Sequence, residues 1–270
     1  MSSAVVRAEW LKLKSYRPFW VVFTLYPVCL GGIVAMSLWG QAKMQEVAQN
    51  AGAGQAVDSN LPFAFPVVWQ SNAYIASWLH FIPAILLILT VTNEFSFRTH
   101  RQNLLEGWSR NQFLTAKGMT ALGLSLYCAA VTLVVTVIAG AVSKSVPTLE
   151  GAEYLLLFFL QSLVYNVFCL LLAFFIRRAA LSLAAFLMYS VILENILAFL
   201  LNLKFAGVGH YLPLEAAGGL VPLPYLKEQA ERVAPGLLSD PGLVVFSLVS
   251  VGYLCLFAGI LWARFRREDL

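Results

Sequence analysis

The chain has 270 residues, of which 60% are hydrophobic and 12% are charged, and its formal net charge is +4. Soluble domains carry about 25% charged residues, so this composition argues against a soluble protein and favours a membrane protein. The cysteines lie inside apolar runs without the C-x-x-C spacing of a metal or redox site, which argues against a disulfide framework.

The first predicted element is a helix over residues 3–17 that lies in the headgroup region of a membrane. Its basic residues Lys12 and Lys14 follow the apolar pair Trp10 and Leu11, a pattern typical of interfacial helices. A cleaved signal peptide is the alternative, but no small-residue cleavage site closely follows the next apolar run.

A membrane-spanning helix needs roughly 20 apolar residues, and six segments are long and apolar enough. They are residues 18–40, 73–95, 116–143, 153–176, 179–203 and 242–263. The connection 41–72 is predicted to be a loop. The sequence therefore predicts an all-α membrane protein of six transmembrane helices, with residues 1–270 forming a single domain and both termini on one side.

Residues 204–241 form a second long connection, in which several prolines interrupt an apolar sequence. Irregular backbone at membrane depth must be covered by protein, because lipid cannot satisfy its hydrogen bonds. The pattern therefore predicts short helices that dip back into the bundle.

The basic residues gather on one side of the predicted topology. That side holds Arg7, Lys12, Lys14, Arg17, Arg98, Arg101, Arg110, Lys117, Arg177, Arg178, Arg264, Arg266 and Arg267. The other side holds Lys43, Lys144, Lys204, Lys227 and Arg232. Lys and Arg are enriched in cytoplasmic loops, so both termini and the connection between the second and third spans are predicted to be cytoplasmic.

Residues 96–115, in that cytoplasmic connection, have the pattern of a short amphipathic helix. Leu104, Leu105 and Trp108 share one helical face. Such a helix could receive a push from a partner and pass it to two spans. The alternative is a surface helix that only caps the bundle.

Ser109 and Gln112 form an S-x-x-Q capping box, in which each side chain satisfies a backbone N–H near a helix start. A new helix should therefore begin near Arg110 and continue into the third span.

Glu194 is the one acidic residue deep inside a predicted span. An acid near mid-membrane costs about 2.5–3.5 kcal/mol on insertion scales, so it should face protein or water and have a partner. Because the Arg177–Arg178 turn joins two antiparallel spans, Gln161 should lie at the depth of Glu194. We predict a Gln161–Glu194 hydrogen bond, or a polar patch shared with Asn166 and Asn195, serving either a transport path or helix association.

The motifs of several other function classes are missing from the sequence. It has no G-x-x-x-x-G-K-[ST] phosphate loop, no histidine spacing for a metal and no triad-like arrangement. The aromatic residues fit a membrane interface and give no indication of nucleic-acid binding. With one intramembrane acid and no evident repeat, an ion-gradient carrier is less favoured than a subunit driven by a nucleotide-hydrolysing partner.

The order of elements resembles the permease subunits of bacterial ABC-2 type transporters. Glu9 and Lys12 form an E-x-x-K-like opening, and the second span ends in N-E-F. The next segment is similar to the family's E-x(n)-[GR]-T-x(n)-L-L-x(n)-S-R-x-x-[FL]-x-x-x-K run. The matching positions are Glu94, Arg98, Thr99, Leu104, Leu105, Ser109, Arg110, Phe113 and Lys117. Where many members have Gly and Pro, this chain has Arg98 and Trp108.

The resemblance implies an exporter of the bacterial inner membrane, in which this chain pairs with a second permease copy or a paralogous permease. Two cytoplasmic ATPase subunits would bind ATP and magnesium, while this chain would bind no cofactor and would not be an enzyme by itself. The coupling residues implied are Glu9, Lys12, Glu94, Arg98, Thr99, Arg101, Leu104, Leu105, Trp108, Ser109 and Arg110. A non-transporting anchor or force-transmitting subunit is the alternative function.

Overall fold

A computed structural model describes residues 3–50, 62–97, 99, 108–205, 207–224 and 241–267 of the chain. Every regular element in these ranges is a helix. In chain order they are α1 (Ser3–Ser15), α2 (Arg17–Asn50), α4 (Val68–Ser77), α5 (Phe81–Ser96), α7 (Arg110–Val142), α8 (Glu153–Ile176), α9 (Ala179–Leu187), η1 (Met188–Leu193), α10 (Glu194–Lys204), η2 (Val208–Tyr211), α11 (Pro213–Gly218) and α13 (Leu243–Arg267).

Five helical segments are long and apolar enough to cross a membrane. They are Arg17–Asn50, Arg110–Val142, Glu153–Ile176, Ala179–Lys204 and Leu243–Arg264. The pair α4 and α5 passes the same test together, with a bend of 42° between the two helices, and would make a sixth. By length and composition the chain is therefore a multi-pass membrane protein.

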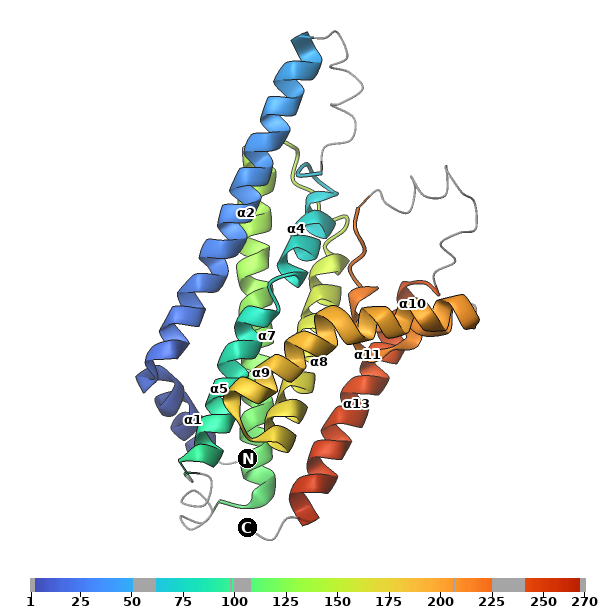
Figure 1. Cartoon of the computed structure of the whole chain (residues 1–270). Coiled ribbons are helices and arrows are strands. Elements are labelled where there is room, and N and C mark those ends of the chain that lie inside the picture. Colours follow the sequence, from blue (N-terminus) through green and yellow to red (C-terminus); the bar gives the residue numbers. More distant parts are fainter. Residues whose placement is uncertain are drawn as a thin grey trace.

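The helix α8 forms the centre of the bundle. It packs against α4, α5, α7, α9, α11 and α13. In the most apolar 18-residue window of each span, 44% of α8 is buried, against 17% for α2, for α13 and for the Ala179–Lys204 segment. These three outer spans therefore keep most of their apolar surface for lipid or for a partner. Figure 1 shows α1, the start of α7 and the end of α13 at one end of the bundle, called here the α1 end.

Two predicted boundaries differ from the structure at the opposite end. The helix α2 continues to Asn50, so the first part of the predicted loop 41–72 is helical. The predicted span 73–95 is two helices that begin at Val68 and break over residues 78–80. Pro83 explains this break, since a proline lacks the N–H of the helical bond and its ring clashes with the carbonyl four residues earlier.

The predicted span 179–203 is also irregular. A π-helix, η1, separates α9 from α10, and Figure 1 shows α10 running obliquely across the bundle rather than along it. Short π-helical insertions are rare and occur frequently at functional sites.

Part of the proline-rich connection 204–241 packs onto the bundle. The short helices η2 and α11 follow α10, and α11 contacts α8 and α13. Leu214, Leu220 and Val221 are almost completely buried. Residues 225–240 of this connection lie outside the described residues.

Candidate functional site

Four charged side chains fasten α1 to the bundle, and we call them the α1 cluster: Glu9, Lys12, Glu94 and Lys117. Lys117 Nζ lies 2.9 Å from Glu9 Oε2 and 2.9 Å from Glu94 Oε1. Lys12 Nζ lies 3.4 Å from Glu9 Oε1 and 3.3 Å from Glu94 Oε1. Each lysine thus bridges a carboxylate of α1 and a carboxylate of α5.

Most of the α1 cluster is out of solvent. The side chain of Lys117 is 3% exposed, those of Glu9 and Glu94 are 8% and 11% exposed, and only Lys12, at 38%, reaches the surface. Charges in such surroundings interact strongly, but each has lost its hydration. Two positive and two negative groups offset each other here, so the loss of one of them would weaken the compensation of the buried charges that remain.

Each member is placed by the local structure of its own helix. Glu9 and Lys12 lie three residues apart and therefore share one face of α1. Glu94 lies in the last turn of α5. Lys117 follows the start of α7, where the predicted capping box of Ser109 and Gln112 is confirmed: Gln112 N donates to Ser109 Oγ at 3.2 Å, and Ser109 N donates to Gln112 Oε1 at 2.8 Å.

The connection between α5 and α7 also contacts the α1 cluster. The ammonium of Lys12 lies 5.2 Å from the ring centre of Trp108, a cation–π contact. The hydroxyl of Thr99 donates to the backbone carbonyl of Glu94 at 3.4 Å. A separate hydrogen bond of 2.9 Å, from Asn93 Nδ2 to Tyr16 Oη, joins α5 to the end of α1. In the described part of the predicted coupling segment, Trp108 thus contacts α1 and Thr99 contacts the last turn of α5.

The predicted coupling residues divide into three groups. Glu9, Lys12 and Glu94 meet in the α1 cluster. Thr99, Trp108, Ser109 and Arg110 lie beside it or at the start of α7. Arg98, Arg101, Leu104 and Leu105 lie outside the described residues. The sequence placed Lys117 in a motif, but nothing in the sequence indicated that it joins the acids of α1 and α5.

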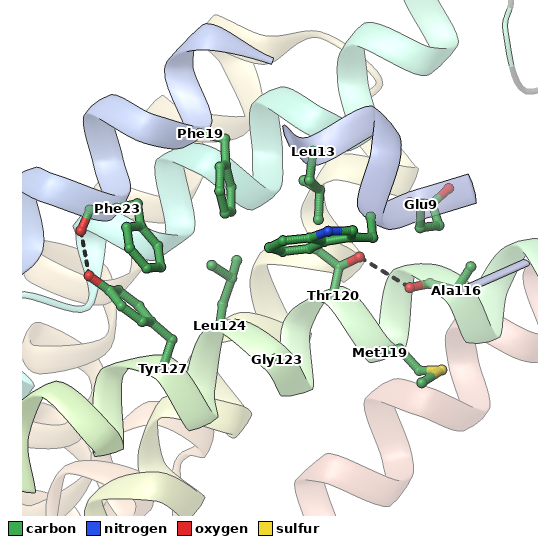
Figure 2. A pocket seen from close by; sticks show the side chains of 11 residues that line it. Glu9, Leu13, Phe19, Phe23, Ala116, Met119, Thr120, Gly123, Leu124 and Tyr127 are labelled. Atoms are coloured by element: carbon green, nitrogen blue, oxygen red, sulfur yellow. Dashed lines mark hydrogen bonds between the residues drawn. The ribbon is translucent and has the colours of Figure 1, made fainter. Parts of the chain in front are cut away.

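Cavities flank α1 on both sides. Figure 2 shows an apolar cavity of about 250 Å³ in which Leu13 of α1 and Phe19 and Phe23 of α2 face α7, with Glu9 toward one end. The phenol of Tyr127, on α7, donates to the carbonyl of Phe23. A second cavity of about 320 Å³ lies between α1, α5 and the start of α7.

A separate polar region surrounds Glu194, far from α1. Its Oε1 accepts hydrogen bonds from the backbone N–H groups of Leu214 at 2.6 Å and Glu215 at 3.0 Å, in the first turn of α11. The structure shows these two bonds in place of the predicted Gln161–Glu194 hydrogen bond. A carboxylate at a helix start compensates backbone donors that have no partner within the helix. Burial raises the pKa of the Glu215 carboxyl.

The other predicted intramembrane residues are partly brought together with Glu194. Gln161 and Asn195 line the same cavity as Glu194, with a volume of about 660 Å³. Asn166 does not line it: its amide donates to Ser125 Oγ of α7 at 2.8 Å and so links α8 to α7. Within the described part of the chain, no group of three or more His, Cys, Asp or Glu residues could hold a metal ion.

Residues 30–270 match the sequence profile of one protein family, whose description is "Protein of unknown function (DUF2705)". A search of curated proteins finds no match.

Proposed function

The chain belongs to the DUF2705 family, and we propose that it is the membrane-spanning permease subunit of an ATP-driven transporter, similar to ABC-2 exporters. The observation that carries this proposal is the α1 cluster. It joins an N-terminal helix to the ends of two apolar segments at the place where the resemblance expects an ATPase to act.

The geometry of the α1 cluster supports a role in transmitting movement. A push on α1, or on segment 96–115, reaches α5 through Glu94 and α7 through Lys117. The links are 2.9–3.4 Å long, and separating them would expose unbalanced buried charge. Movement of α1 should therefore displace α5 and α7 with it and tilt the membrane-spanning helices.

The positive-inside rule supports a cytoplasmic α1 end in the bacterial inner membrane. Six spans, with α4 and α5 counted as one, then leave both termini in the cytoplasm. Besides Lys12 and Lys117, the basic side chains described near this end are Arg7, Lys14, Arg17, Arg110, Arg177, Arg178 and Arg264. Lys43 and Lys144 lie toward the opposite end.

The energy for transport would come from partner subunits. The sequence has no phosphate-binding loop, so ATP and magnesium would be held by two cytoplasmic ATPase subunits. A second permease copy, or a paralogous permease, would complete the transport path. The broad apolar surfaces of α2, α13 and the Ala179–Lys204 segment are available for that copy and for lipid.

Co-purification from the native membrane tests this proposal. A tag on the C-terminus should recover an ATPase in about equal amount. The double variant Leu104→Asp, Leu105→Asp should lose the ATPase, because it makes the predicted apolar face of the coupling segment polar. Leu149→Asp is the matched control: Leu149 is 83% exposed and lies between α7 and α8 at the opposite end. This variant should retain the ATPase.

Absence of any ATPase under gentle extraction would contradict the proposal. Recovery of an ATPase whose activity supports no export of any cargo would instead favour the anchor or force-transmitting function.

A further inference from the structure

The cavity of about 660 Å³ around Glu194 has both polar and apolar side chains in its lining. It lies between the α4–α5 break, α8, the π-helix η1 and α11. Small-molecule sites commonly have volumes of about 300–1,000 Å³ and combine apolar walls with a few polar groups. Tyr74, Trp78, Phe81, Tyr165 and Phe186 form aromatic walls here.

His80 lines this cavity and carries a buried hydrogen-bond acceptor in its imidazole ring. Its Nδ1 lies within hydrogen-bonding distance of the Ser77 carbonyl oxygen. A carbonyl can only accept, so Nδ1 carries the proton, and in the neutral ring Nε2 is then an acceptor. His80 is 3% exposed, and within the described chain Nε2 has no hydrogen-bond partner. Stacking on Tyr165, with ring centres 4.7 Å apart, fixes the orientation of the imidazole.

Gln161 and Glu194 add two further acceptors. Gln161 is 3% exposed and Glu194 is 2% exposed. The side-chain oxygens Gln161 Oε1 and Glu194 Oε2 have no hydrogen-bond partner in the part of the chain that the structure describes. Buried acceptors left unsatisfied destabilise the folded state, and more so when the group is charged. A ligand toward which these side chains turn, and which donates to them, would satisfy these acceptors.

The acidic lining and aromatic walls of the cavity, together with the unsatisfied acceptors of its lining residues, indicate the complementary ligand. The cavity is lined by two acids, Glu194 and Glu215, and by no Lys or Arg among the described residues. A primary ammonium group has three donors, a positive charge and an attraction to aromatic faces. We propose that this cavity binds a primary ammonium group carried on an apolar or aromatic body. The site concerns binding only and stands whether or not an ATPase partner exists.

The backbone around the cavity is irregular on two sides. The α4–α5 break brings His80 to the cavity, and η1 precedes Glu194 directly. Oε1 of Glu194 is held by α11, so its carboxylate is positioned before any ligand arrives. Fixed groups of this kind favour binding, because less conformational entropy is lost on association.

Equilibrium dialysis of the purified chain in an uncharged maltoside detergent tests the proposal with tryptamine as the probe. Tryptophol has the same indole body with a neutral hydroxyl. We expect saturable binding of tryptamine and at least about tenfold weaker binding of tryptophol. Glu194→Gln should weaken tryptamine binding by at least about tenfold, while its amide oxygen still accepts from α11. Glu46→Gln, which removes an exposed acid at the end of α2, is the matched control and should bind normally.

A second variant guards against a folding defect in Glu194→Gln. Gln161→Met keeps the length of the side chain and removes the acceptor, so tryptamine should bind several-fold more weakly at an unchanged unfolding temperature. Equal binding of tryptamine and tryptophol, or binding unchanged in both variants, would overturn the proposal, as would no saturable tryptamine binding at millimolar concentration.

The ammonium group could come from a free amine or from an aminophospholipid. Added phosphatidylethanolamine that displaces tryptamine, while phosphatidylglycerol does not, identifies the lipid headgroup as the source. Displacement by neither lipid identifies a free amine.

Discussion

Lys117 is the side chain on which the attachment of α1 depends most. It contacts an acid of α1 and an acid of α5 at the same distance, and it is the most buried member of the α1 cluster. Lys43 makes a shorter ion pair of 2.6 Å with Glu46, but both side chains are more than half exposed. Water and salt screen the exposed pair, whereas the acids beside Lys117 have little solvent to replace their partner.

We expect Lys117→Met to lower the free energy of unfolding by about 3–5 kcal/mol, because it leaves Glu9 and Glu94 short of positive charge in a buried place. Thermal unfolding of the detergent-solubilised protein would measure this change. Lys43→Met, the same substitution at an exposed pair, should cost no more than about 1 kcal/mol. Equal unfolding temperatures for the two variants would show that the α1 cluster contributes little to stability.

The sequence indicated the members of this site better than their arrangement. A family pattern identifies Glu9, Lys12 and Glu94 in the sequence. Ser109 is identified by its capping box, which depends on residues only three positions apart. The Lys117–Glu9 contact joins residues 108 positions apart, and no local pattern encodes such a distance. The Gln161–Glu194 bond is likewise predicted from depth alone, whereas in the structure Glu194 accepts from the backbone of α11.

The segment after α10 depends on a close approach of the backbones of η2 and α10. Gly209, in η2, is buried against α10, and its N–H donates to Asn202 Oδ1 at 2.7 Å. A Cβ at this position would lie 2.3 Å from the carbonyl oxygen of Ala198. Gly209 therefore allows the chain to fold back and present α11 to Glu194.

We expect Gly209→Ala to destabilise the protein by about 1–3 kcal/mol, because the backbone of η2 or α10 must move to relieve the overlap. Gly259→Ala is the control: a Cβ on Gly259, in α13, meets no atom within 4 Å. There the helix should gain up to about 1 kcal/mol from the better helix former. Unfolding temperatures measured side by side should move in opposite directions, and a shared direction would contradict the proposed packing.

The helices themselves were largely predictable, and their interruptions were less so. Residues 153–176 form a helix with the predicted bounds, because a long apolar run with a turn at each end specifies both the helix and its limits. The break before α5 has a local cause in Pro83, which the apolar pattern alone does not reveal. The π-helix η1 has no such marker in the sequence.

The proposed orientation makes the two ends of the helix bundle chemically distinguishable. Phe97, at the α1 end, is 75% exposed and Leu149, at the opposite end, is 83% exposed. In a background without the native cysteines, Leu149→Cys should react with a membrane-impermeant maleimide in spheroplasts. Phe97→Cys should react only after lysis, because the proposal places it in the cytoplasm. The reverse pattern would show that the α1 end faces outward.

The charge balance of the α1 cluster has a consequence for how α1 responds to ionic strength. A basic helix held by anionic lipid headgroups detaches as salt screens that attraction, and the Debye length falls to about 3 Å at 1 M. The ion pairs of α1 lie mostly out of solvent, where screening is weak. A high-salt wash should therefore leave α1 bound to the bundle. The helix α1 then behaves as an integral part of the helix bundle and not as a peripheral, salt-sensitive attachment.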